Sequence, residues 1–366
     1  MSLPLQGLKV IELEGLAPSV FTGMVLADFG ADVTIINKPE QGLQISDISE
    51  NYMNRGKKSI CMDLKNQGDI LNLKIMLQQA DVLIDCYRPG ILEKLGLSPE
   101  ELQKNNPKLI ICRITGFGQT GSLSKIAGHD INYVAMSGML SLLGKQNQPP
   151  QPPINLLADF GAGGSFGVIG ILMALYDRNK TQKGQIIDVS MTETTGYLGS
   201  FIDSIRNNKK WNDVPGTNLL DGGAANYRCY KTKDGKYMAV GSLEPQFYER
   251  FVKGTQINPE KLEGGFDKNQ ELFEQIFLKK TQKEWTDIYN KLDCCVTPVL
   301  NLDEVKQSKY WNERNSLITM DGKVQFAPQP KLSSVQHYQN QHIKPSPKKG
   351  QDQKEIYKIY GIKPKL

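Results

Sequence analysis

Residues 8–36 read LKVIELEGLAPSVFTGMVLADFGADVTII, and this stretch decides the fold class. Its first six residues are rich in branched side chains and alternate as a strand does. Pro18 suits the first turn of a helix that runs to about Phe29. Gly30 ends this helix, and 31–36 is a second strand. The stretch therefore predicts a βαβ unit and with it a parallel sheet.

The alternation of strands and helices continues through the first half of the chain. We expect strands at 59–62, 81–85, 109–115 and 185–190, and a helix at 68–79. This order predicts an α/β fold with a Rossmann-like parallel sheet. No Gly-x-Gly-x-x-Gly motif follows the first strand, which disfavours an ordinary NAD site. Ligands of open α/β sheets bind beyond the carboxyl ends of the strands, so a site is expected there.

His129 occupies such a position. It follows the Gly-rich loop 116–121, which comes after the strand 109–115, and it opens an apolar, helix-like run. An imidazole titrates near neutral pH and can both accept and return a proton, so His129 is a candidate acid/base. The alternative is structural, because a histidine near a helix start often serves only as a hydrogen-bonding group.

Asp159 is the second candidate, in the stretch Asn155-Leu-Leu-Ala-Asp-Phe-Gly161. Our hypothesis is that Asp159 and His129 face each other across one carbon atom of a substrate. The structural alternative is that Asp159 caps the helix that follows it. Gly163 and Gly164 allow close approach either of a ligand or of another helix.

The net charge of +5 is concentrated at the C-terminus. Residues 344–366 contain seven Lys against Asp352 and Glu355, so the rest of the chain is balanced. A balanced body excludes a nucleic-acid footprint. The Lys-rich end is interpreted as a solvated tail, with attraction of an anionic ligand as the alternative.

The composition also bears on compartment and membrane. The six Cys form no CxxC pair and no zinc set with a nearby His, which favours buried thiols in a reducing compartment. The N-terminus lacks a secretory pattern, and the longest apolar run, 168–176, is too short to cross a bilayer. The ending Pro364-Lys-Leu366 approximates the Ser-Lys-Leu peroxisomal address. We expect the protein in a peroxisome, a mitochondrion or both, with the cytoplasm as the alternative.

A second region begins after about residue 200. Its clearest element is a hairpin at 227–232 and 236–241, with Lys233-Asp-Gly235 as the turn. The expected domains are a large domain at 1–200 completed by about 301–340, a linker at 201–221, a small α+β domain at 222–300 and a Lys-rich tail at 341–366.

Several motifs together carry a family resemblance. They are Gly15-Leu-Ala-Pro18, Val25-Leu-Ala-Asp-Phe-Gly-Ala31, Thr115-Gly-Phe-Gly-Gln119, Ala127-Gly-His-Asp-Ile-Asn-Tyr133, Asn155-Leu-Leu-Ala-Asp-Phe160, Leu220-Asp-Gly-Gly223, Val240-Gly241, Glu244-Pro-Gln-Phe-Tyr248 and Cys295-Val-Thr-Pro-Val299. On these stretches the chain resembles the alpha-methylacyl-CoA racemases of the class III CoA-transferase (formyl-CoA transferase-like) superfamily.

The resemblance implies an enzyme of lipid metabolism, including bile-acid biosynthesis. Such an enzyme interconverts R and S 2-methylacyl-CoA thioesters at C2 through an enolate. His129 matches the base for one enantiomer, Asp159 its partner on the opposite face, and Glu244 the carboxylate that orients the imidazole. The resemblance implies no metal and no separate cofactor, because CoA is part of the substrate.

The resemblance also implies contacts to the thioester and the CoA arm. The matching residues are Lys38, Met62, Asp63, Leu64, Lys65, Arg88, Gly128, Asp130, Ile131, Asn132 and Tyr133. The family commonly has Arg at the position of Lys38, so a bidentate phosphate contact becomes a point-charge contact. The backbone N–H of Asp130 is suited to the enolate oxygen.

The family fold is an interlocked homodimer of the class III CoA-transferase type. If this chain is similar, its active sites form between the large domain of one chain and the small domain of the other. Glu244 would then act on the partner subunit's His129.

Two other functions stay open at this point. A CoA-transferase would use Asp159 as a nucleophile that carries acyl and CoA intermediates and would not need His129. A non-catalytic acyl-CoA binder would need none of the three titratable residues.

Overall fold

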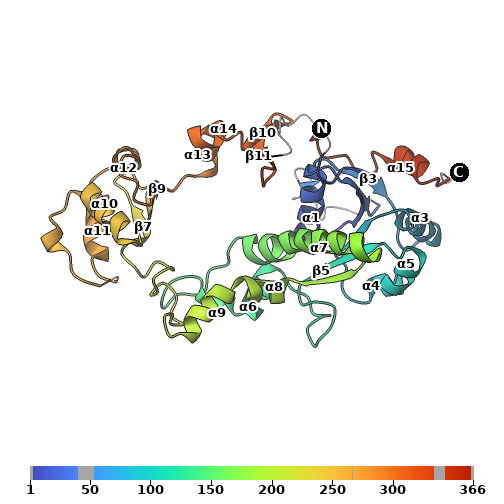
Figure 1. Cartoon of the computed structure of the whole chain (residues 1–366), viewed down its shortest axis with the longest axis horizontal. Coiled ribbons are helices and arrows are strands. Elements are labelled where there is room, and N and C mark those ends of the chain that lie inside the picture. Colours follow the sequence, from blue (N-terminus) through green and yellow to red (C-terminus); the bar gives the residue numbers. More distant parts are fainter. Residues whose placement is uncertain (1–2, 40–52, 266, 334–342, 364–366) are drawn as a thin grey trace. The chain divides into compact units, whose positions relative to one another are not determined.

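The computed structural model of the chain describes residues 3–39, 53–265, 267–333 and 343–363. The expected C-terminal address, Pro364 to Leu366, lies outside the described residues. The chain divides into two compact units (Figure 1). The large unit comprises Met1–Ser137, Pro153–Leu198 and Asn315–Leu366, and the small unit comprises Gly138–Pro152 and Gly199–Arg314.

The large unit contains a parallel sheet with the order β3-β2-β1-β4-β5-β6. Its strands are β1 (Lys9–Leu13), β2 (Asp32–Asn37), β3 (Lys58–Cys61), β4 (Val82–Asp85), β5 (Ile110–Thr115) and β6 (Ile186–Ser190). This doubly wound order reverses between β1 and β4, which is where such sheets bind ligands. The expected α/β fold with a Rossmann-like parallel sheet is confirmed.

Helices cover the sheet of the large unit. They are α1 (Ala17–Asp28), α3 (Gln67–Leu77), α4 (Ile91–Lys94), α5 (Pro99–Asn105), α6 (Asp130–Met136), the π-helix η2 (Leu156–Gly164), α7 (Ser165–Thr181), α8 (Met191–Leu198) and α15 (Gln353–Ile359). A hairpin of β10 (Leu317–Met320) and β11 (Lys323–Phe326) completes the unit.

Alternation along β1 divides its side chains between the two faces of the sheet. Ile11 and Leu13 enter a core cluster with residues of α3, α5 and α15. Glu12 lies on the other face, fully buried, and pairs with the equally buried Lys57 at 2.8 Å. Gly23 of α1 makes room for this pair, because a Cβ there would lie 1.7 Å from Glu12 Oε2.

The small unit has its own sheet and core. Antiparallel strands β7 (Tyr227–Lys231), β8 (Tyr237–Gly241) and β9 (Val296–Pro298) form the sheet. Its helices are η1 (Met139–Leu142), α9 (Ser200–Asn207), α10 (Pro245–Thr255), η3 (Pro259–Lys261), α11 (Gln270–Phe277), α12 (Gln282–Tyr289), α13 (Leu302–Gln307) and α14 (Lys309–Glu313). Its core is aromatic and includes Tyr230, Phe251 and Trp285. The expected hairpin and α+β character are confirmed.

The C-terminal region differs from the predicted solvated tail at 341–366. Ile356, Tyr357 and Tyr360 of the α15 region are buried in the same core cluster as the sheet. The sequence predicted a solvated tail because lysines dominate the composition of this segment and its apolar face is short. The large unit is thus completed by 343–363 as well as by β10 and β11, and the segment 138–152 belongs to the small unit.

One described helical segment, Leu156–Thr181, is long and apolar enough to cross a bilayer by length and composition. It combines η2 with α7, so it is longer than the apolar run visible in the sequence. Its first half packs on α1, as Gly164 O accepts a hydrogen bond from Thr22 Oγ1 at 3.0 Å. A helix packed in this way is weak evidence for a membrane span.

Candidate active site

The carboxylate of Asp130 ties the two candidate acid/base elements together. Asp130 is the first residue of α6, directly after His129, and its side chain is buried. Its Oδ2 accepts hydrogen bonds from the backbone N–H groups of Ala158 and Asp159, both at 2.9 Å. His129 and Asp159, the two predicted acid/base residues, are 30 positions apart in the sequence. The Asp130 carboxylate therefore holds the segments that contain them next to each other.

Tyr133 fixes the backbone that presents His129. Its hydroxyl donates to Gly128 O, and its ring lies against Gly116, which begins the Gly-rich loop, and against Gly128, which precedes His129. A Cβ would lie 2.1 Å from Tyr133 Cε1 at Gly116 and 2.7 Å at Gly128, so only glycine fits at these two places. His129 has extended backbone at the N-cap of α6, and its N–H donates to Asn132 Oδ1 at 3.0 Å. The His129 side chain is exposed.

Asp159 lies on the π-helix η2 and is 9 % exposed. The pKa of its carboxyl is raised to about 6, mainly by burial and to a smaller extent by the charge of Asp130. A hydrogen bond from Asn155 Nδ2 at 3.0 Å and the charge of His129 act in the opposite direction. A π-helix is rare and occurs often at functional sites. The result is a carboxyl that titrates near neutral pH beside an imidazole, as acid/base chemistry requires.

The two glycines after Asp159 serve packing. A Cβ at Gly163 would lie 2.9 Å from Pro18 Cβ and from Met191 Cγ, and one at Gly164 would lie 2.6 Å from Phe21 Cδ1. Of the two explanations left open by the sequence, close helix packing accounts for both positions.

The predicted CoA contacts follow the strands of the sheet. Lys38 comes directly after β2, and its ammonium lies 5.4 Å from the centre of the Tyr87 ring. Arg88 follows β4 and is exposed. Burial raises the pKa of the Tyr133 hydroxyl, and the charge of Arg88 acts in the opposite direction. Since the carboxyl ends of parallel strands share one edge, these cations lie along the same edge as His129.

The loop after β3 contains four of the predicted CoA contacts, and one of them, Met62, is buried. Met62 is 1 % exposed and its side chain is part of the core, so only its backbone can meet a ligand. Asp63 and Lys65 are exposed, and Leu64 is partly buried. Ile131 is exposed on α6.

Glu244 belongs to the small unit, as the N-cap residue of α10, and is exposed. Its charge is near Cys295, whose pKa is raised by burial first and then by Glu244. Glu244 and His129 belong to different units.

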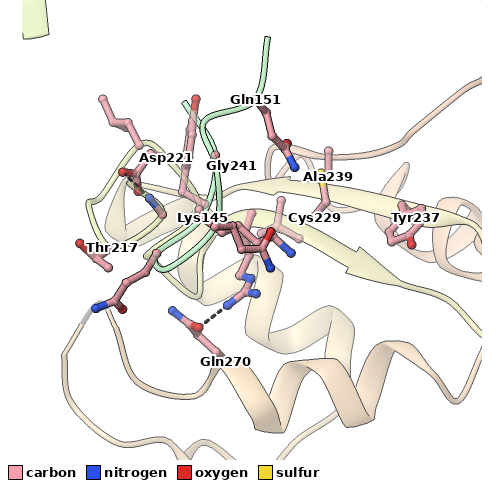
Figure 2. Close-up of a pocket in the computed structure, with 18 of the residues that line it drawn as sticks. Lys145, Gln151, Thr217, Asp221, Cys229, Tyr237, Ala239, Gly241 and Gln270 are labelled. Atoms are coloured by element: carbon pink, nitrogen blue, oxygen red, sulfur yellow. Dashed lines mark hydrogen bonds between the residues drawn. The ribbon is translucent and has the colours of Figure 1, made fainter. Parts of the chain in front are cut away.

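The small unit also contains a cavity of about 940 Å³ that sequence reasoning did not identify (Figure 2). It is lined by β7 and β8 and by residues of the segments 144–151 and 216–222. The Asp-Gly-Gly and Val-Gly motifs that carry the resemblance both contribute to the lining. The Asp221 carboxylate accepts from the backbone N–H of Gly216 at 2.9 Å and of Asn218 at 2.8 Å. Asp221 thus shapes this loop.

Sequence reasoning also missed two residues that hold site groups in place. Asn155 donates to Asp159, and the i, i+4 spacing of these residues was the available signal. Glu14 accepts a hydrogen bond from the backbone N–H of Lys38 at 2.6 Å. Only the tertiary fold relates these two residues. Among the described residues, no group of three His, Cys, Asp or Glu side chains is placed to hold a metal ion.

The large unit has a doubly wound sheet, with the buried Asp159 carboxyl and the exposed His129 on neighbouring segments, and the small unit is α+β. These features define an α/β protein of two units. Residues 5–353 match the family model described as CoA-transferase family III. The chain therefore belongs to CoA-transferase family III.

Relatives cover the chain almost completely. It is 44 % identical to the alpha-methylacyl-CoA racemase of Mus musculus, over 98 % of this chain and 93 % of that protein. It is 42 % identical to the alpha-methylacyl-CoA racemase of Homo sapiens, over 98 % of this chain and 94 % of that protein. The crystal structure of a CaiB/BaiF family protein from Brucella suis matches with a TM-score of 0.83 at 25 % identity, over 98 % of this chain and all of that one.

Proposed function

We propose that this protein is an alpha-methylacyl-CoA racemase, which interconverts the R and S forms of 2-methylacyl-CoA thioesters. The observation that carries the proposal is the buried Asp159 carboxyl held next to the His129 element by Asp130. Identity of 42–44 % to the racemases of two mammals, over 98 % of this chain, supports the same activity. CoA belongs to the substrate, and the chain's own side chains supply the acid and the base.

In the proposed mechanism, one group removes the C2 proton and the other returns a proton to the opposite face. When His129 is the base, Asp159 must be protonated, and a carboxyl with a pKa of about 6 can be so at working pH. In the reverse direction the carboxylate accepts the proton and the imidazolium donates one. The backbone N–H of Asp130 remains the predicted donor to the enolate oxygen.

The alternative, transfer of CoA between acids with Asp159 as nucleophile, is tested by leaving out the acceptor. A single enantiomer of a 2-methylacyl-CoA is incubated with the protein and no free carboxylic acid, and chiral chromatography follows the acyl group. The racemase should reach an equal mixture of R and S forms. Turnover that occurs only after an acid is added, with a trappable thioester on Asp159, would instead identify a transferase.

The raised pKa of Asp159 predicts an acid limit to activity. Below about pH 6 the Asp159 carboxyl is protonated and can no longer act as the base for its enantiomer, so kcat/KM for that enantiomer should fall. Asn155→Gly keeps the left-handed backbone at this position (φ 58°) but removes the amide that favours the carboxylate. Its acid limb should move to higher pH by about 0.5–1 unit. A pH profile of kcat/KM for both proteins measures the shift, and an unchanged or lowered limb would contradict this assignment.

We also propose that the chain acts as a homodimer in which Glu244 orients His129 of the partner subunit. The surface of the large unit supports a partner, because large apolar side chains of η2, α7 and α8 are exposed. These are Leu156, Ile169, Leu172, Met173, Tyr176, Tyr197 and Leu198. A monomeric protein rarely exposes so many large apolar groups on neighbouring elements.

Co-expression of two inactive chains tests this arrangement. Glu244→Gln alone should lower kcat about 10–100-fold, since it removes the group that orients a catalytic side chain. If the site is shared between chains, a hybrid dimer of His129→Ala and Glu244→Gln chains has one site with both residues intact. Random pairing should restore about one quarter of wild-type activity. Activity no higher than that of the separate variants, in a preparation shown to be dimeric by sedimentation, would refute the shared site.

A further inference from the structure

The C-terminal segment returns to the edge of the sheet in the large unit. Asp352 Oδ2 accepts from the backbone N–H of Ser59 at 2.8 Å, and Gln353 Oε1 accepts from that of Cys61 at 2.8 Å. Asp352 N–H donates in turn to Ser59 O at 2.9 Å. These contacts provide hydrogen-bond partners for backbone groups on the edge of β3 that is not paired with β2. Figure 1 shows α15 beside that strand. The position of the residues just before Asp352 is therefore fixed by the sheet.

A closed ring of polar contacts carries Lys349 to the carboxyl end of β1. Gly350 N–H donates to Ser59 Oγ at 2.9 Å, and Ser59 Oγ donates to Asn37 Oδ1 at 2.6 Å. Asn37 Nδ2 donates to Glu14 Oε1 at 3.1 Å. The ammonium of Lys349 lies 3.1 Å from the same Glu14 oxygen, which closes the ring.

The carboxylate of Glu14 thus positions two lysines. Its Oε2 holds the backbone of Lys38, and its Oε1 holds the ammonium of Lys349. Glu14 is buried, whereas Lys38 is exposed and the Lys349 side chain is 24 % exposed. Both lysine side chains are therefore at least partly exposed to solvent at the ligand-binding edge of the sheet. A phosphate group accepts hydrogen bonds from ammonium groups, and a lysine contributes as a point charge.

We propose that Lys349 is a second cationic ligand, together with Lys38, for the phosphate groups at the nucleotide end of CoA. This inference rests on the proposed acyl-CoA substrate. A single lysine offers less than the paired N–H groups of an arginine, and a second ammonium supplied by the C-terminal segment makes up the difference. Among the lysines of that segment, Lys349 then has a specific role in binding phosphate.

Calorimetric titration with free CoA, 3′-dephospho-CoA and pantetheine tests the proposal on the intact protein. Lys349→Met should weaken CoA binding about tenfold, the usual effect of losing one charge-assisted hydrogen bond. Lys348→Met is the matched control, since it removes the same charge from an exposed neighbour, and it should change affinity less than about twofold. Neither variant should alter the binding of pantetheine, which has no phosphate.

Lys349→Arg should retain CoA affinity, because it keeps the charge. If Lys349→Met loses affinity for CoA only, the contact is to the 3′-phosphate, and if it loses affinity for dephospho-CoA as well, the contact is to the diphosphate. Either outcome supports the proposal. Unchanged CoA affinity overturns it, as does an equal loss for CoA and pantetheine with a lowered Tm, which would make Lys349 a fastening for the segment alone. This titration measures binding and does not require racemase activity. If the wild-type protein binds CoA but does not racemise, the proposed function is refuted and the role of Lys349 can still be tested.

Discussion

Replacing His129 with alanine is expected to lower the rate of racemisation about 10²–10⁴-fold, the usual contribution of a positioned acid/base group. His129 is exposed, whereas Asp159 is almost fully buried. Protons from the solvent should therefore reach C2 mainly through the imidazole. Loss of His129 should therefore slow the exchange of the C2 proton with heavy water by the same factor as racemisation.

The measurement is proton NMR of C2 in heavy water, with chiral chromatography on the same samples. The His129 backbone is fixed by Asn132 and Tyr133, so the alanine variant should keep its fold and its CoA affinity. Calorimetric titration with CoA is the control. A variant that binds CoA and still racemises at the wild-type rate would remove His129 from the mechanism.

Asp159→Asn is expected to reduce racemisation by a similar factor of about 10²–10⁴, because an amide cannot exchange a proton at C2. Asparagine keeps the shape of the side chain, and the backbone contact to Asp130 does not involve the carboxyl. The exposed imidazole remains in this variant. It should still remove the C2 proton on its own face and return a deuteron, so exchange should continue with retention of configuration.

The pattern of label separates this variant from the His129 variant. Chiral chromatography followed by mass spectrometry measures deuterium in each enantiomer. We expect exchange without inversion in Asp159→Asn, and in His129→Ala an exchange that is slowed together with racemisation. Racemisation at the wild-type rate in Asp159→Asn would show that the second proton comes from another group.

The strands of the large unit could be predicted because their residues are branched, apolar and set between glycines and prolines. Those are local signals, and β1, α1 and β2 follow them closely. The two acid/base candidates were also visible, since His129 follows a Gly-rich loop after a strand and Asp159 precedes a Gly-rich stretch at the start of a helix. The chemistry of the residue types, and their order along an α/β chain, was enough to select them.

The contacts that hold the site could not be predicted, because they join distant parts of the chain. Asp130 was predicted to contact the substrate, but nothing in the sequence showed that its carboxylate also accepts hydrogen bonds from the π-helix of Asp159. No local sequence pattern predicts a π-helix. The π-helix forms here directly after Ile154 and Asn155, whose backbone is left-handed. The packing of α15 was missed because a helix of seven residues has only a few apolar positions.

The central claim is that two opposed groups, an imidazole and a carboxyl, serve one carbon atom. It is tested most directly by giving the wild-type protein each pure enantiomer of a 2-methylacyl-CoA in heavy water and following configuration and label together. Both enantiomers should converge on the same equal mixture, with deuterium at C2. Recovery of each enantiomer with its configuration and its C2 proton intact would contradict the account.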